Sequence, residues 1–303
     1  MRILITGSNG LLGQKLVAAL RGSEEVELIA TSRGPDRTPT REGYRYFELD
    51  CTDRAQVDRV FGTAAPDAVI HTAAMTNVDA CELDPGSCRL QNVTAVENLV
   101  QAARPMQSHF IHLSTDFVFN GANGPYTEDD TPDPLSVYGH SKLDSEAIVR
   151  SAGLDHWSIA RTIIVYGVAP GLSRSNVVLW ARNALERGEP IRVVDDQWRM
   201  PTLAEDLADG CIRIVQRKAT GIYHLSGPDL MSILELVHRV GRFFQLDTAH
   251  VAPVKSDSLG QPARRPPRTG FKLEKARRDL GFAPRHFEEG LAVLREQLRT
   301  VSR

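Results

Sequence analysis

Cysteine is scarce in this chain of 303 residues, and its thiols are not arranged to bind a metal or to cross-link a small domain. They form no C-x-x-C pair and join no histidine cluster with metal-ligand spacing. We therefore expect no metal site, and we interpret the thiols as small buried side chains in a reducing, cytoplasmic protein. The four cysteines are Cys51, Cys81, Cys88 and Cys211.

An excess of one charge is also absent, as is any hydrophobic run long enough to span a bilayer. The formal net charge of -2 argues against a dedicated nucleic-acid-binding protein, because such proteins usually carry a basic excess. A strand-like run, Arg2–Thr6, stands where a secretory signal would have its basic and apolar regions. We therefore expect a cytoplasmic protein that binds neither nucleic acid nor a membrane.

The first half of the chain has a regular alternation of short apolar runs and amphipathic segments. This rhythm predicts an α/β fold in which a doubly wound parallel sheet of the Rossmann kind carries helices on both faces. The predicted strands are 3–6, 26–31, 44–49, 67–72, 109–114 and 156–166, and the predicted helices are 11–20, 54–61, 93–103 and 136–151.

The rhythm breaks after Tyr166, where loops rich in Gly, Pro, Ser and Arg separate shorter elements. Such segments predict a smaller, mixed α/β C-terminal lobe that covers the substrate, with mostly helices after residue 226. We therefore assign 1–166 to a dinucleotide-binding Rossmann domain with a returning segment at 203–225. The substrate-binding lobe is then 167–202 and 226–303.

Three glycines with the spacing G-x-x-G-x-x-G follow the first predicted strand and lead into a helix. Glycine lets the backbone turn sharply and approach a pyrophosphate, and the start of the helix offers free N–H groups to the phosphates. The position between a strand and a helix favours a dinucleotide loop over a plain tight turn. The loop residues predicted to bind the cofactor are Gly7, Asn9, Gly10, Leu11, Leu12 and Gly13.

The end of the second strand indicates which dinucleotide binds. A carboxylate there would accept a hydrogen bond from the ribose 2′-hydroxyl of NAD, but the sequence has Ser32 and Arg33, which suit a 2′-phosphate. We therefore favour NADP(H), with NAD(H) as the alternative. Further cofactor contacts are expected after the third and fourth strands, from Asp50, Cys51, Thr72, Ala73 and Ala74.

A second motif, Y-x-x-x-K, places Tyr138 and Lys142 one turn apart on a predicted helix. An adjacent ammonium group would lower the pKa of the phenol, so that Tyr138 would protonate the alkoxide formed as hydride arrives. Lys142 would also bind the nicotinamide ribose, so both residues are predicted to contact the cofactor. At the end of the fifth strand we choose Thr115 to hydrogen-bond the substrate carbonyl oxygen, with Ser114 as the neighbour that faces inward instead.

Together these residues resemble the extended short-chain dehydrogenase/reductase superfamily and, more narrowly, the dTDP-4-dehydrorhamnose reductase family. The resemblance covers nearly the whole chain and thins after residue 226. The motifs that carry it are Thr6–Gly13, Ala73–Asp79 with Glu82, Ser114–Phe119, Gly124–Tyr126, Pro134–Gly139 with Ser141-Lys142, Arg161-Thr162, Val165–Gly167, and Asp196-Gln197 with Pro201-Thr202.

The resemblance implies an NADPH-dependent oxidoreductase with a catalytic triad of Thr115, Tyr138 and Lys142. It implies hydride delivery to C4 of a nucleotide-linked 4-keto-6-deoxysugar, as in the conversion of dTDP-4-dehydrorhamnose to dTDP-rhamnose. Dimers are common in this superfamily, so a homodimer is expected as well. The residues implied to contact the substrate are Thr76, Val78, Asp116 and Ile164.

The chain departs from the family pattern at three places. Ile164 stands where rhamnose-forming reductases often carry an aromatic side chain, and Arg199 replaces the usual glycine after the Asp-Gln-x unit. The distal lobe, which carries Arg264, Arg265 and Arg268, matches the family pattern only loosely. The basic run Arg264–Arg268 is either a solvated loop or a clamp for a phosphorylated ligand. The sugar, the nucleotide and the stereochemistry at C4 therefore stay open.

Two other functions fit the same fold. The resemblance extends to the regulatory β-subunit of methionine adenosyltransferase, which works through a partner enzyme and would make this chain a non-catalytic NADP-binding subunit. A nucleotide-sugar epimerase is the other alternative, although the Ser32-Arg33 pair favours an exchangeable NADPH. We interpret His71 and His112 as core histidines rather than catalysts.

Overall fold

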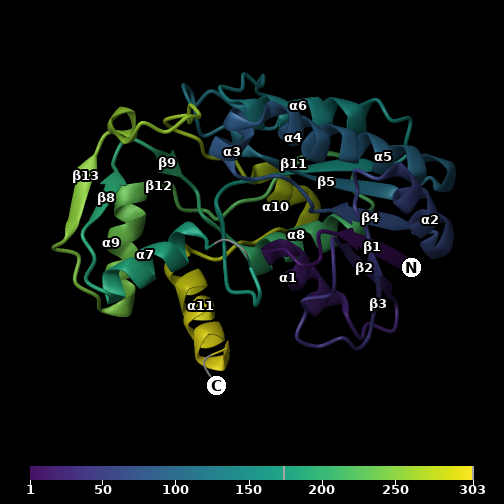
Figure 1. Cartoon of the computed structure of the whole chain (residues 1–303), viewed down its shortest axis with the longest axis horizontal. Helices are drawn as coiled ribbons and strands as arrows, with labels where there is room; N and C mark the ends of the chain where they lie inside the picture. Colours follow the sequence, from purple (N-terminus) through teal and green to yellow (C-terminus); the bar gives the residue numbers. More distant parts are fainter. Residues whose placement is uncertain (173–174, 302–303) are drawn as a thin grey trace.

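Seven parallel strands form the central sheet of the computed structural model, which describes residues 1–172 and 175–301. Residues 173, 174, 302 and 303 of the predicted lobe lie outside the described residues. The strand order β11-β6-β5-β4-β1-β2-β3 confirms the predicted doubly wound fold (Figure 1). The strands are β1 (Arg2–Thr6), β2 (Glu27–Ser32), β3 (Arg45–Glu48), β4 (Ala68–His71), β5 (His109–Thr115), β6 (Trp157–Thr162) and β11 (Gly221–His224).

Both faces of this sheet are covered by helices, which explains why its inner strands are apolar on both sides. Ile3, Ile5 and Leu28 pack under α1 (Leu11–Leu20) and α8 (Ala204–Arg217). Leu4 and Val69 point to the opposite face. The helices that cover this second face are α2 (Arg54–Ala64), α5 (Ala95–Ala103) and α6 (Val137–Arg150).

A chain of short helical segments connects β4 to α5 and brings side chains of this connection near the carboxyl end of the sheet. It begins with α3 (Val78–Leu83) and α4 (Pro85–Arg89) and continues through one π-helical turn, Leu90–Thr94. The sequence analysis predicted a plain helix from Val93 onward. The buried cysteines of α3 and α4, Cys81 and Cys88, pack in one cluster with Tyr138.

The C-terminal lobe has its own core beyond the carboxyl ends of the strands. Its helices are α7 (Val177–Glu186), α9 (Ile233–Phe244) and α11 (Phe287–Val301). Its strands are β8 (Ile191–Val194), β9 (Trp198–Arg199), β12 (Met231–Ser232) and β13 (Val251–Val254). No helix among the described residues has the length and apolar character that crossing a membrane requires.

The structure corrects three predictions about this half of the chain. The predicted strand 156–166 is two strands, β6 and β7 (Val165–Tyr166), because Ile164 has a positive φ of 35° that ends the extended course. β7 pairs with β10 (Thr202–Leu203) instead of the central sheet. β13 pairs with β8 in a region predicted to be mostly helical, and α10 (Glu274–Leu280) packs in the sheet core although we assigned it to the lobe.

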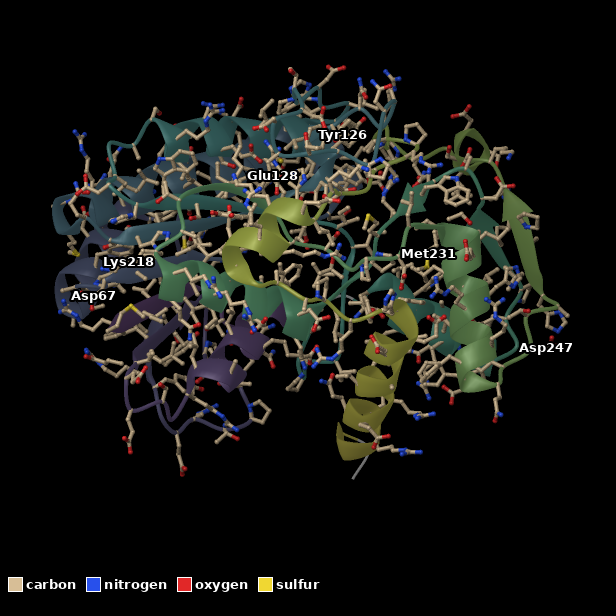
Figure 2. The ribbon with its side chains drawn as sticks, turned by 180° about the vertical axis from the view of Figure 1, so that it is seen from behind. Asp67, Tyr126, Glu128, Lys218, Met231 and Asp247 are labelled. Carbon is tan, nitrogen blue, oxygen red and sulfur yellow. The ribbon has the colours of Figure 1, made fainter. Side chains whose placement is uncertain are left out.

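The carboxyl ends of the strands face the lobe. Asp67 and Lys218, which precede β4 and β11, lie at the far end of the sheet in Figure 2, whereas Met231 and Asp247 lie in the lobe. In open parallel sheets ligands bind at the carboxyl edge. The residues that end β1, β2, β4 and β5 are therefore the ones to inspect for a site.

The burial of His109 predicts part of the acid sensitivity of the fold. Its Nε2 lies 3.1 Å from the Ser158 hydroxyl, its Nδ1 has no partner, and burial lowers its pKa to about 4. In the unfolded chain a histidine binds its proton near pH 6.5, so the free energy of unfolding falls as the pH drops from about 6.5 to 4. We expect His109→Gln to reduce this fall by about 2 kcal/mol between pH 6.5 and 4.5, measured by urea unfolding.

The exposed His250 provides the control for this measurement. His250→Gln should keep the wild-type pH dependence of stability. A wild-type slope in His109→Gln would contradict the assignment of the proton uptake to His109.

Candidate active site

The loop after β1 needs glycine for steric reasons that the structure makes explicit. Gly7 has a φ of 72°, and a Cβ there would lie 2.8 Å from the backbone nitrogen of Ala73. A Cβ on Gly13 would overlap with the carbonyl oxygen of Gly7. No side chain caps the start of α1 at Gly10, so the first N–H groups of this helix are available to an anion. These features fit a pyrophosphate.

Most of the predicted cofactor residues line one cleft at the carboxyl edge of the sheet. Ser32 and Arg33 stand at the end of β2, and the Arg33 guanidinium donates to Oε1 of Gln91 at 3.3 Å. Sequence reasoning missed Leu49 and Thr52 after β3, and Gln91 and Ala95 in the helical segment after β4, which carries no motif. The predicted residues in the wall are Gly7, Gly10, Ser32, Arg33, Asp50, Cys51, Thr72, Ala73 and Ala74.

The other predicted loop residues have internal contacts. The Asn9 side chain donates to the carbonyl of Pro35 at 3.0 Å and accepts from the backbone N–H of Arg37 at 2.8 Å. It therefore fixes the segment that follows β2. Leu11 and Leu12 are half-buried in the first turn of α1. A direct contact of Asn9, Leu11, Leu12 or Gly13 with the cofactor stays a prediction.

The helix α6 is placed against the end of β5 by two local features. Ser136 caps the helix by accepting from the backbone N–H of Gly139 at 3.2 Å. A Cβ on Gly139 would overlap with the carbonyl oxygen of Phe117, so glycine lets the helix approach the segment that follows β5. Tyr138 and Lys142 are consequently buried on the inner face of α6.

The Thr115 hydroxyl, where β5 ends, is close enough to the Tyr138 phenol to lower its pKa, although burial outweighs this effect. The neighbouring Ser114 faces the interior instead, and its hydroxyl donates to Oε1 of Glu146 at 2.6 Å. Glu146 in turn accepts from Arg161 at 2.9 and 2.7 Å, which neutralises both charges beneath the site. The structure therefore brings Thr115, the hydroxyl that we chose from the sequence, to the phenol.

The pKa of Tyr138 shifts in the opposite direction to our prediction. Burial raises the pKa of the phenol far more than the Thr115 hydroxyl lowers it, and Asp116 adds to the increase. Lys142 does not offset this burial. Tyr138 is therefore a neutral phenol in the chain without ligands, which is the form that can donate a proton.

Lys142 lies against a row of buried histidines that the sequence analysis interpreted as core residues. Its Nζ is 3.1 Å from Nε2 of His112, and the rings of His112 and His71 stack with centroids 5.4 Å apart. At the end of the row His71 Nδ1 lies 2.7 Å from the hydroxyl of Thr6, the residue before the glycine loop. Burial holds the pKa of His112 well below its usual value and lowers that of Lys142 to about 8.

The predicted substrate residues have different surroundings. Val78 packs in the cluster that contains Tyr138, and Thr76 is exposed just before α3. Ile164 is half-buried at the break between β6 and β7. Asp116 is buried, and its carboxylate accepts from Thr115 and Thr269. Contact of these four residues with a sugar stays a prediction.

The basic run 264–268 is tethered rather than freely solvated. Arg265 donates to both carboxylate oxygens of Asp79 at 3.0 and 2.8 Å, which joins the lobe to α3. Arg268 lies over the ring of Trp198 at 5.4 Å. Within residues 1–172 and 175–301, no group of three or more His, Cys, Asp or Glu side chains is arranged to hold a metal ion.

A comparison with known families identifies what this site is part of. The family model described as the RmlD substrate binding domain matches residues 1–300. The chain belongs to the RmlD family. This finding confirms the resemblance to dTDP-4-dehydrorhamnose reductases that the motifs indicated.

Individual RmlD-like relatives cover almost the whole chain. A dTDP-4-dehydrorhamnose reductase of Sinorhizobium fredii is 33% identical over 302 residues, which is 95% of each chain. Methionine adenosyltransferase 2 subunit beta of Xenopus laevis is 32% identical over 282 residues, 90% of this chain and 82% of the relative. The crystal structure of a dTDP-4-dehydrorhamnose reductase from Bacillus anthracis in complex with NADP is 28% identical, covers 98% of this chain and 99% of its own, and superposes with a TM-score of 0.84.

Because Lys142 is buried, we predict that this site residue lowers the stability of the fold. An exposed lysine titrates near pH 10.4, so between about pH 8 and 10 the folded protein loses a proton that the unfolded chain keeps, and stability rises with pH. We expect Lys142→Met to raise the free energy of unfolding at pH 7 by up to about 3 kcal/mol, and this gain to shrink toward pH 10. Urea unfolding at both pH values measures the effect.

The exposed Lys272 gives the matched control, since Lys272→Met removes a similar side chain without a burial penalty. A Lys142→Met protein that is less stable than wild type at pH 7 would show that the contacts of the ammonium outweigh its burial.

Proposed function

We propose that this chain is an NADPH-dependent reductase that acts on the 4-keto group of a nucleotide-linked 6-deoxysugar, such as dTDP-4-dehydrorhamnose, to give the dTDP-rhamnose type of product. The observation that carries the proposal is that buried Tyr138 and Lys142 of α6 lie with Thr115 at the end of β5, on the same carboxyl edge of the sheet as the glycine cleft. The RmlD family and its dTDP-4-dehydrorhamnose reductase relatives support the substrate class.

Different residues of the chain have different roles in the proposed reaction. The nicotinamide cofactor, when bound, supplies the hydride that adds to the carbonyl carbon. The Thr115 hydroxyl donates to Asp116 in the chain without ligands, and it would turn this proton to the carbonyl oxygen to polarise the substrate. The neutral phenol of Tyr138 donates its proton to the same oxygen as negative charge develops. The ammonium of Lys142, one turn away, stabilises the phenolate that remains until solvent returns the proton.

The cleft favours NADP(H). The residues at the end of β2 are Ser32 and Arg33 rather than a carboxylate, and both line the cleft, where a 2′-phosphate would be held by charge-assisted hydrogen bonds. The RmlD-like structure that contains NADP agrees with this choice. NAD(H) is the alternative, and we place Tyr138 and Lys142 near the ribose of either cofactor.

Location and assembly belong to the same proposal. The four cysteines are buried and unpaired, which is the usual state in a reducing compartment and supports a cytoplasmic enzyme. The proposed substrate is a small nucleotide sugar, and a homodimer is the assembly that we expect.

A regulatory subunit is the second candidate, because methionine adenosyltransferase 2 subunit beta is about as similar to this chain as the reductases are. A regulatory role would need no buried proton donor, yet Thr115, Tyr138 and Lys142 are all in place. Co-purification with a partner enzyme, together with no turnover of any keto sugar, would favour this candidate.

The first test of the proposal is turnover. We expect NADPH to be consumed with a dTDP-4-keto-6-deoxysugar, and Tyr138→Phe to lower kcat by about 10²- to 10⁴-fold because the proton donor is lost. Thermal shift with NADPH should show that cofactor binding survives. Tyr223→Phe on β11 is the control, and unchanged turnover in Tyr138→Phe would remove the assignment.

The second test concerns cofactor choice. Arg33→Ser removes a charged donor to the 2′-phosphate, so we expect the Kd of NADPH to rise by about 10- to 100-fold while that of NADH changes little. Fluorescence titration of the two cofactors measures this. The nearby exposed Arg41, changed to Ser, should affect neither Kd, and an equal loss of both cofactors in Arg33→Ser would argue against a 2′-phosphate contact.

A further inference from the structure

Arg199 is a charged side chain in the interior, at the position where the family pattern has glycine. Its side chain is only 2% exposed. A guanidinium in such surroundings must be paired and hydrogen-bonded to be tolerated. It donates to the carbonyls of Pro266 and Trp198 at 2.7 and 2.8 Å, and its Nε lies 3.6 Å from Oδ2 of Asp116. The buried guanidinium therefore has backbone carbonyls on one side and a carboxylate on the other.

Asp116 provides the first route from Arg199 to the catalytic hydroxyls. Its Oδ1 accepts from the Thr115 hydroxyl at 3.1 Å, and its Oδ2 accepts from the Thr269 hydroxyl. Thr115 in turn lies close enough to Tyr138 to lower the pKa of the phenol. The carboxylate thus fixes the rotamer of Thr115, and the guanidinium supplies the charge that keeps this carboxylate paired.

Phe117 provides a second route. The Arg199 guanidinium lies over the Phe117 ring at 5.6 Å, and this ring meets the Tyr138 ring edge-on with centroids 5.9 Å apart. Cation–π and edge-to-face contacts both restrain orientation. One buried side chain therefore contacts both Asp116, which binds Thr115, and Phe117, which packs on Tyr138.

The far side of Arg199 is held by the lobe. The backbone N–H of Trp198 donates to the Pro267 carbonyl at 2.8 Å, and that of Thr269 donates to the Trp198 carbonyl at 3.1 Å. These bonds hold β9 and the 266–269 segment together as one part of the lobe. Arg199 extends from this part of the lobe to Asp116. A shift of the lobe would therefore also move the side chains at the end of β5.

We propose that Arg199 is a positioning residue for Thr115 and Tyr138, which it acts on by clamping Asp116 and Phe117 against the 266–269 segment of the C-terminal lobe. Without it Asp116 is a buried carboxylate with no opposite charge, and Thr115 and Phe117 lose the contacts that orient them. The kinetic test of this proposal rests on the proposed reductase function. The crystallographic test does not depend on that function.

The kinetic test uses Arg199→Met, Asp116→Asn and the double variant. We expect each single variant to lower kcat by about 10- to 100-fold, the size of a displacement near 1 Å, while the Kd of NADPH stays within about twofold. Because Arg199 acts through Asp116, the double variant should lose less than the product of the two single losses. Two single losses that multiply in the double variant would overturn the proposal.

Arg239→Met is the matched control. Arg239 also pairs with carboxylates, Asp229 and Glu288, and lies over an aromatic ring in the lobe, but it is on α9. It should keep the wild-type kcat. An equal loss of kcat in Arg239→Met would mean that the effect of Arg199 is only a general loosening of the lobe, which overturns the proposal.

Thr269→Val covers the case in which Arg199→Met does not fold, because it removes only the hydroxyl that donates to Asp116. It should lower kcat by about 3- to 10-fold at unchanged NADPH Kd, in line with one lost hydrogen bond. Wild-type kcat in Thr269→Val, or in a folded Arg199→Met, would overturn the clamp.

A crystal structure of Arg199→Met or Thr269→Val separates this inference from the proposed function. If the wild-type protein turns over no keto sugar, the reductase proposal fails, and the positions of Thr115 and Phe117 in the variant still decide the inference. A changed Thr115 rotamer or a rotated Phe117 ring supports the clamp. Wild-type positions of both side chains overturn it.

Discussion

The site depends on one close approach, that of α6 to the segment that follows β5. Gly139 has no room for a side chain because the carbonyl of Phe117 occupies the space. This contact holds Tyr138 beside Thr115 and buries Lys142 against His112. The same burial keeps the phenol of Tyr138 neutral, and it makes the charged ammonium group of Lys142 unfavourable for the stability of the fold. The chemistry of the site therefore follows from the distance between one helix and one strand end.

The close approach of α6 to the end of β5 buries charged side chains. This cost is offset where a buried charge is paired with an opposite one. Arg161 neutralises Glu146 below the catalytic strand, and Arg199 faces Asp116 at its end. A third pair, Arg265 with Asp79, joins the lobe to α3. Removing one member of such a pair leaves an uncompensated charge. The Arg199–Asp116 pair and the partly exposed Arg265–Asp79 pair thus link the Rossmann half to the lobe.

The family shares its fold among proteins with different roles, so the fold alone does not assign an activity. Relatives named as reductases and as a regulatory subunit match this chain about equally well. We base the assignment on features of this chain: a proton donor in its neutral state, a hydroxyl near it and a cleft that suits a dinucleotide. All three are present at the carboxyl edge of one sheet, and this is why we favour the reductase.

The sequence by itself determined the sheet, the glycine loop after β1 and the Y-x-x-x-K pair, because periodicity and short spacings act locally along the chain. It also predicted that Ser114 faces the interior and that Thr115 does not, since alternate residues of a strand face opposite sides. Only the tertiary structure decided the break at Ile164, the direction of the Tyr138 pKa shift and the partners of Arg199. Each of these depends on burial or on contacts between distant segments, which no local pattern encodes.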